Sequence, residues 1–223
     1  MTYAEKCEYI LSIQESDIKI LNEKQKTIIN RLSNDNESVI RSDVAITLID
    51  FVDNFSKNIL IKLLNDKDYL VRAEAADSLR YFYFQEVYEL LKESTNDTHY
   101  LVRGYAIYSM TCVGIYIQIE NNIIKQIINN LLKREKNYFV KLNCYNSLYD
   151  LGCEEQFNNI ISIFKSTNYR NRCAVINVLG YILSNKNYKD IKIFITKKID
   201  NEPVYAVLSS MKKLLDRIND DFE

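Results

Sequence analysis

The chain has 223 residues and a formal net charge of −1, and 47% of its residues are hydrophobic against 26% charged. This globular balance argues against wholesale disorder, and the near-zero charge argues against the broad basic surface of a nucleic-acid binder. With only four Gly and one Pro, the sequence also disfavours a β-sandwich or β-barrel, because those folds need many tight turns.

The first 22 residues predict an N-terminal helical cap. They open with the polar segment Met1–Lys6 and lack the basic and apolar regions of a secretory signal. No later apolar run reaches the roughly 18 residues that a membrane helix needs. Five scattered cysteines, without a C-x-x-C pair, favour reduced, buried thiols, so we expect a cytoplasmic protein with no membrane partner.

A motif then recurs along the chain with a step of 31 residues. Residues 66–79 read Asp-Lys-Asp-Tyr-Leu-Val-Arg-Ala-Glu-Ala-Ala-Asp-Ser-Leu, and residues 97–110 repeat the Asp, the Tyr-Leu-Val-Arg and an Ala. Related segments start at 35, 135, 166 and about 198. The step between the third and fourth copies is 38, so we expect seven extra residues there, within Gly114–Asn122.

Each copy predicts a helix, a short polar turn and a second helix. After the second turn, for example, Val71, Ala75, Leu79 and Phe82 follow helical spacing. Antiparallel helix pairs joined by short turns stack into a solenoid, because each pair buries its apolar stripe on its neighbours. We therefore predict an all-α solenoid of about six helix pairs, as a single domain over residues 1–223.

The motif from Asp66 to Leu79 resembles the HEAT-like repeat of the phycobilisome-lyase type, and the resemblance extends over residues 20–219. It implies a right-handed solenoid whose second helices line a concave wall, and it carries almost no information about activity. The fourth repeat departs from the pattern with Lys141 in place of Arg, and the sixth has Val204 there. Tyrosine also stands where family members often carry Pro, at Tyr69, Tyr100, Tyr138 and Tyr169.

Several conspicuous residues are interpreted as structural. The column Asp35, Asp66 and Asp97 could hold a metal, but a turn Asp before a helix is more often a helix cap that accepts backbone N–H bonds. His99 is the single histidine and is expected to be a solvated turn residue, so the commonest zinc sites are not available. Nucleotide-binding and hydrolase motifs are absent, so we predict no enzyme, no cofactor and no metal. A column of basic residues also recurs in the repeats, and the resemblance implies that its side chains bond to the turn of the next repeat. In the alternative reading, the same column is an anion-binding ladder. Its members are Arg41, Arg72, Arg103, Lys141 and Arg172.

The spacing of the second helix in each repeat also predicts an exposed stripe of side chains beside the buried apolar stripe. Tyrosine supplies large contact area with a polar tip, and carboxylates attract a basic partner. In the alternative reading, the tyrosines of this stripe simply replace Phe and Leu in the packing of the stack. Residues 1–112 hold 18 acidic against 13 basic residues, and residues 113–223 hold 12 against 16, so charge is uneven along the chain. The predicted partner-binding residues are Asp43, Asp50, Glu74, Asp77, Tyr81, Tyr105, Tyr108, Asn143, Asn146, Asp150, Asn177 and Tyr181.

These features predict a non-enzymatic protein-binding scaffold with a concave, partly acidic, tyrosine-rich groove. One specific form is a bacterial immunity protein or antitoxin that neutralises a basic toxin domain, as a monomer or as a heterodimer with its partner. The alternative is a HEAT-like nucleic-acid-binding protein or DNA-repair glycosylase, which the acidic stripe and the absence of Trp disfavour. A lyase or chaperone for a chromophore is the third reading, and no residue pattern supports it.

Overall fold

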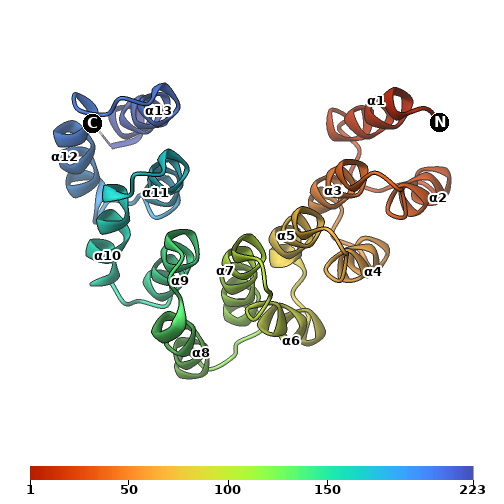
Figure 1. Cartoon of the computed structure of the whole chain (residues 1–223), viewed down its shortest axis with the longest axis horizontal. Coiled ribbons are helices and arrows are strands. Elements are labelled where there is room, and N and C mark those ends of the chain that lie inside the picture. The colour runs from red at the N-terminus through yellow and green to blue at the C-terminus, as the bar shows by residue number, and fades with distance from the viewer. Residues whose placement is uncertain (223) are drawn as a thin grey trace. The chain divides into compact units, whose positions relative to one another are not determined.

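The computed structural model describes residues 1–222, and every regular element in that part of the chain is helical (Figure 1). Thirteen α-helices and three short 3-10 turns are present there, so the predicted all-α solenoid class is confirmed. The helices form two compact units, Met1–Glu135 and the part from Lys136 onward.

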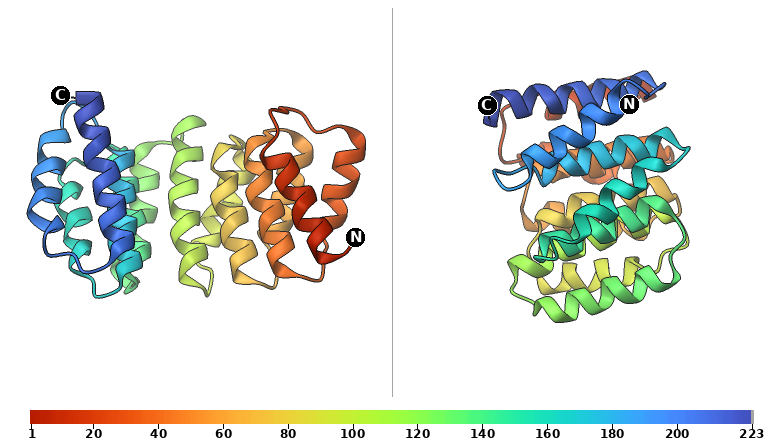
Figure 2. Two further views of the ribbon diagram at one scale, coloured as in Figure 1. Left: turned by 90° about the horizontal axis from the view of Figure 1, so that it is seen from above. Right: turned by 90° about the vertical axis from the view of Figure 1, so that its left-hand side faces the viewer.

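The first unit consists of two layers of helices. One layer contains α1 (Tyr3–Gln14), α3 (Ser38–Thr47), α5 (Tyr69–Ser78) and α7 (Tyr100–Tyr116), and 3-10 turns at Leu48–Asp50 and Leu79–Tyr81 extend α3 and α5. The outer layer contains α2 (Glu23–Leu32), α4 (Asn54–Leu63) and α6 (Gln85–Ser94), and α8 (Asn121–Arg134) follows α7. Helix α5 packs between α3 and α7, and the three helices run side by side (Figure 2).

The second unit repeats this arrangement. Its inner layer contains α9 (Tyr138–Asp150), α11 (Tyr169–Tyr181) and α13 (Tyr205–Phe222) (Figure 1). Its outer layer contains α10 (Gln156–Ser162), extended by a 3-10 turn at Ile163–Lys165, and α12 (Tyr188–Ile199).

The predicted apolar stripes form the core between the layers. Val71, Ala75, Leu79 and Ala106 are all 0% exposed, and the two alanines let neighbouring backbones approach closely. Ser78 Oγ uses this proximity to donate to the carbonyl of Ala45 at 2.9 Å, which joins α5 to α3. Each fully buried Val or Leu contributes about 1.5–3 kcal/mol, so this stripe dominates the stability of the stack.

A ladder of ion pairs fastens each turn to the next. Arg41 donates from Nε and Nη2 to the two carboxylate oxygens of Asp66, both at 2.7 Å, while its Nη1 donates to the carbonyls of Asp35 and Asn36. Arg72 repeats this geometry with Asp97, at 2.8 and 3.0 Å. The predicted role of the arginine column as a link between turns is therefore confirmed for these repeats.

The ladder also extends to the more divergent repeats, and it is interrupted once. Its first rung is Lys6–Asp35 at 2.6 Å, and its later rungs are Arg103–Glu135 and Arg172–Glu202, at 2.9 and 2.7 Å. At the fourth repeat Lys141 occupies the arginine position, but Ser166 replaces the expected carboxylate. No described side chain forms an ion pair with Lys141, so one joint lacks its rung.

The turn aspartates are acceptors, but they are not the helix caps. Asp66 accepts from the backbone N–H of Asp68 at 2.9 Å, and Asp68 then caps α5 by accepting from Leu70 N at 2.8 Å. The same division holds in the next turn, where Asp97 accepts from His99 N and the Nδ1 of His99 accepts from Leu101 N.

The prediction that His99 is a solvated turn residue is therefore wrong. Its ring is half-buried and stacks on Tyr69 with centroids 3.7 Å apart. Burial lowers the pKa of His99, which keeps Nδ1 available as an acceptor. The four predicted column tyrosines are the first residues of α5, α7, α9 and α11, the position where Pro is favoured because its missing N–H has no helical partner there.

The sixth repeat begins later than predicted. Glu202, not residue 198, occupies the ladder position, so the step from Ser166 is 36 residues. The arginine position of this repeat is then Leu208 rather than Val204, and Tyr205 joins the tyrosine column. The extra residues lie in the connection after α11 and in α12, whose 12 residues exceed the 10 of α4 and α6.

The predicted insertion near Gly114–Asn122 is confirmed in position, since α7 extends to 17 residues and α8 to 14. None of the five cysteines is in a disulfide, but only Cys144 is buried; the other four are half-buried, contrary to the prediction. None of the described helices combines the length and apolar character needed to cross a bilayer. Within residues 1–222, no group of His, Cys, Asp and Glu side chains is arranged to hold a metal ion.

Candidate protein-binding surface

Three predicted site residues of the first unit form a cluster, which we name the acidic wall: Asp43 on α3, and Glu74 and Asp77 on α5. The buried positions Val71 and Ala75 face the core, so these carboxylates lie on the neighbouring, half-buried stripe. Asp77 forms an ion pair with Arg80 one turn later. Asp43 and Glu74 have no hydrogen bond or ion pair to any described side chain.

The electrostatics of the acidic wall are unfavourable in the free protein. Burial raises the pKa of Asp43. Burial also raises the pKa of Glu74, and the negative charges of Asp77 and Asp43 raise it further. The pKa of Asp77 is raised by burial as well, although Arg80 acts in the opposite direction. A cation placed on this wall would relieve both the desolvation and the repulsion.

Exposed apolar side chains flank the acidic wall at both ends. Val39 and Leu70 are 52% and 44% exposed at the N-terminal ends of α3 and α5. Ile46 and Tyr81 are 42% and 40% exposed toward the other end, and the guanidinium of Arg80 lies over the Tyr81 ring at 4.9 Å. Exposed apolar side chains bordered by polar residues mark surfaces that bind a partner, and here such side chains lie beside the carboxylates.

The other predicted residues of the first unit extend this surface. Tyr105 and Tyr108 project from α7 and are half-buried, and Asp50 is exposed at the end of the 3-10 turn after α3. Val39, Leu70 and Ile46 lie on the same stripe and were not among the predicted site residues.

The prediction is wrong for two residues of the second unit. Asn143 and Asn146 on α9 are 9% and 2% exposed, so neither amide is available to a partner. Asn143 Nδ2 donates to the carbonyl of Phe139 at 2.9 Å, one turn earlier on the same helix, which explains how its polar group is accommodated. Asp150, at the end of α9, keeps an exposed surface, but the surrounding protein raises its pKa to about 6 by desolvation.

Asn177 and Tyr181 lie together, in a different chemical setting from the acidic wall. They line a hollow of about 470 Å³ between α11 and α13, where Lys213 and Arg217 form the opposite side. Arg217 Nη1 donates to the carbonyl of Gly180 at 3.0 Å. The predicted stripe ended at Tyr181 on α11, so this basic side on α13 was not predicted.

Comparison with known proteins supports the repeat assignment. Residues 26–111 match the family model for HEAT repeats. The predicted likeness to HEAT-like repeats is thus confirmed for this part of the chain, which covers α2 to the middle of α7. A comparison with curated protein sequences finds no match.

Solved structures with a similar fold cover nearly the whole chain at low sequence identity. The complex of CpcE and CpcF of phycocyanin lyase from Nostoc sp. PCC7120 aligns with a TM-score of 0.62 and 13% identity, covering 96% of this chain and 94% of that chain. Human deoxyhypusine hydroxylase in complex with glycerol aligns with a TM-score of 0.46 and 14% identity, covering 98% and 97%. The likeness to the phycocyanin lyase complex therefore supports the α-solenoid fold of this chain and gives no information about its activity.

Proposed function

We propose that the protein is a non-enzymatic scaffold that binds a basic surface of another protein with the acidic wall and its apolar flanks. The observation that carries this proposal is the pair of half-buried carboxylates, Asp43 and Glu74, that no described cation neutralises. This arrangement is unfavourable in the free protein, because burial raises the pKa of both carboxyl groups and the charges of Asp77 and Asp43 raise that of Glu74 further. An arriving Lys or Arg would be attracted at a distance and would then form a partly desolvated ion pair.

Two further features support a protein as the partner. The flanking residues Val39, Leu70, Ile46 and Tyr81 offer apolar area next to the charges, which a folded partner or a peptide can cover. The structurally similar phycocyanin lyase is a complex of two proteins, so this type of fold serves protein assembly there. In the specific form of the proposal, the partner is a basic toxin domain and the chain is its immunity protein or antitoxin.

The test is capture of a partner by the immobilised chain, with the captured protein identified by mass spectrometry. The double variant Asp43→Asn and Glu74→Gln removes both unpaired charges without changing side-chain size. The matched control Asp17→Asn and Glu93→Gln removes the same charge from exposed residues away from the wall. We expect the wall variant to weaken binding at least about tenfold and the control to leave it unchanged.

Two results would contradict the proposal. Equal capture by the wall variant and the wild type would show that the acidic wall is not the binding surface. Binding of the chain to duplex DNA, weakening steeply as salt rises, would favour the nucleic-acid alternative instead. The immunity role also predicts that the captured protein is toxic when expressed alone and harmless when co-expressed with this chain.

A further inference from the structure

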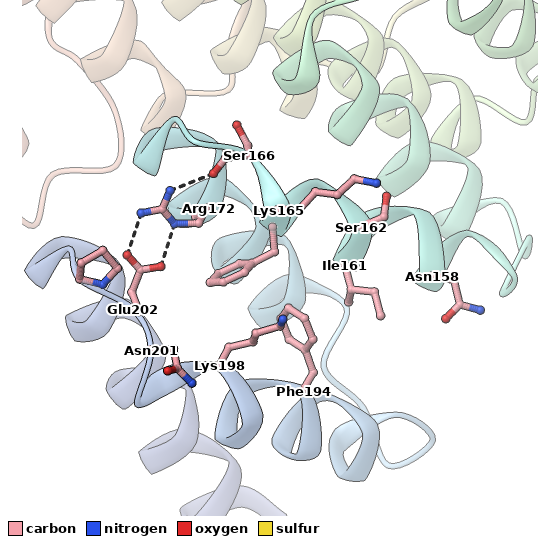
Figure 3. Close-up of a pocket in the computed structure, with 12 residues that line it drawn as sticks. Asn158, Ile161, Ser162, Lys165, Ser166, Arg172, Phe194, Lys198, Asn201 and Glu202 are labelled. Atoms are coloured by element: carbon pink, nitrogen blue, oxygen red, sulfur yellow. Dashed lines mark hydrogen bonds and ion pairs between the residues drawn. The ribbon is translucent and has the colours of Figure 1, made fainter.

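The outer layer of the second unit contains a groove that is separate from every predicted partner-binding residue. A hollow of about 740 Å³ lies between α10 with its 3-10 turn and α12, and the turn before α13 closes one end (Figure 3). A second hollow of about 550 Å³ shares Asn158, Ile161 and Phe194 with the first and continues along the same two helices. Together they form an elongated depression, which we name the α10–α12 groove.

The floor of the groove is apolar and well supported. Phe164 is 8% exposed and meets Phe194 edge-to-face, with ring centroids 5.4 Å apart and planes at 88°. Figure 3 shows Phe194 projecting from α12 toward Ile161 on α10. All three side chains pack on the core of the second unit, so the floor is fixed by packing rather than free to collapse.

The rim of the first hollow carries two positive charges that no described acid pairs with. Lys165 lies at the end of the 3-10 turn and Lys198 lies on α12, and both are exposed and form no ion pair with any described residue. The second hollow is close to neutral, since Glu154 and Asp190 line it together with Lys186 and Lys197. Glu202 also lines the groove, but its two oxygens are held by Arg172 at 2.7 Å each, so this pair contributes little net charge.

Uncharged polar groups complete the lining. Asn158 and Ser162 lie along α10, and Asn201 lies after α12, so both sides of the groove present hydrogen-bonding groups above the aromatic floor (Figure 3). The groove is therefore amphipathic, with its net positive charge in the first hollow, and it extends over two hollows instead of enclosing one compact cavity. An elongated site of this type suits a peptide segment, which lays apolar side chains on the floor and polar ones along the rim.

We propose that the α10–α12 groove binds an acidic peptide segment of a partner protein, with an aromatic or aliphatic side chain on Phe164 and Phe194 and carboxylates at Lys165 and Lys198. The choice of an acidic occupant rests on charge complementarity with the unpaired lysines. This surface is independent of the acidic wall, because it lies in the other unit and has the opposite charge. The scaffold would thus have two surfaces that bind partners of opposite charge.

The probe is a short fluorescein-labelled peptide in which two phenylalanines are placed among glutamates, titrated with the full chain and followed by fluorescence polarisation. We expect saturable binding that weakens as salt rises, since exposed charge pairs are screened. The double variant Lys165→Glu and Lys198→Glu should weaken binding at least about tenfold. A peptide with serine in place of both phenylalanines should lose most of its affinity for the wild-type chain, because serine cannot cover Phe164 and Phe194.

The matched control is Lys189→Glu with Lys212→Glu, which changes the net charge of the second unit equally but lies outside both hollows. Chemical-shift mapping by NMR with the same peptide should report residues of α10 and α12. Absence of saturable binding, or equal weakening by the control variant, would overturn the proposal. Concentration-dependent self-association abolished by Lys165→Glu and Lys198→Glu would also overturn it, by identifying a second copy as the occupant.

Discussion

Replacing Arg72 by Met removes one rung of the ladder while keeping most of the aliphatic side chain. In the wild type the guanidinium donates to Asp97 at 2.8 and 3.0 Å and to the carbonyls of Asp66 and Lys67 at 2.9 and 3.2 Å. The side chains of Arg72 and Asp97 are 16% and 15% exposed, so the pair is largely removed from water. The substitution therefore leaves a desolvated carboxylate without its cation.

The expected loss follows from the partners that remain. Breaking a buried ion pair by removing one member costs about 3–5 kcal/mol. Asp97 keeps its bond from His99 N and has some solvent access, so we expect a loss near the lower limit, about 3 kcal/mol. Arg72→Lys keeps the charge but cannot reach both the carboxylate and the two carbonyls, so it should lose about 1–2 kcal/mol.

The chain contains its own control for this experiment. Lys141 occupies the same repeat position but faces Ser166, so Lys141→Met should change the unfolding free energy by less than about 0.5 kcal/mol. Urea denaturation measures the change, and native-state hydrogen exchange at the turn amides of residues 97–100 locates it. A loss below about 1 kcal/mol for Arg72→Met, or an equal loss for Lys141→Met, would refute the ladder as the fastening between repeats.

The pH dependence gives a second readout of the same rung. The guanidinium of Arg72 and the bond from His99 N lower the pKa of Asp97 despite its burial. A lowered folded-state pKa means that the stabilisation is present above the unfolded pKa of Asp and is lost as pH falls through the folded pKa. The difference between wild type and Arg72→Met should therefore be large at neutral pH and should shrink in acid.

Three further substitutions test other features. Ser166→Asp supplies the missing carboxylate opposite Lys141 and should stabilise the second unit by up to about 1 kcal/mol in thermal unfolding. Asp150→Asn should stabilise at pH 8 by about 1 kcal/mol after discounting for solvent screening, and this gain should vanish as pH falls through about 6 toward the ordinary Asp value, because only the ionised form is penalised. Gly114→Val should cost about 1–3 kcal/mol, since even a Cβ there lies 2.8 Å from Ile124 Cδ1. A neutral result at Gly114, an unchanged stability for Ser166→Asp, or a pH-independent effect at Asp150 would contradict the corresponding argument.

The fold could be predicted from the sequence because the repeat expresses the same physical requirements in each copy. The apolar positions around Val71, the small residue at Ala75 and the turn Asp recur at one step, and each feature has a single structural role. The prediction failed where that step changed. Glu202 replaces Asp as the ladder acid after a longer connection, so a search for the 31-residue step placed the last turn too early.

The candidate surface was predicted less completely. Helical spacing identified Asp43 and Glu74 as neighbours on one face, and the structure places them together without a cation. Spacing does not report what covers a helix face, so the burial of Asn143 and Asn146 could not be foreseen. The α10–α12 groove was not predicted, because Phe164 and Phe194 come from different repeats and each is typical of an ordinary core residue.

The ladder has a direction, and this makes one segment of the chain interchangeable. Each arginine reaches forward to the acid of the following turn, as Arg41 does to Asp66 and Arg72 to Asp97. Residues 66–96 therefore begin with the acceptor that the preceding repeat requires and contain the donor for the Asp that follows. A duplicate of these 31 residues inserted before Asp97 would present the correct partner at both junctions. The protein thus carries a module from which longer arrays of the same helical stack can be assembled.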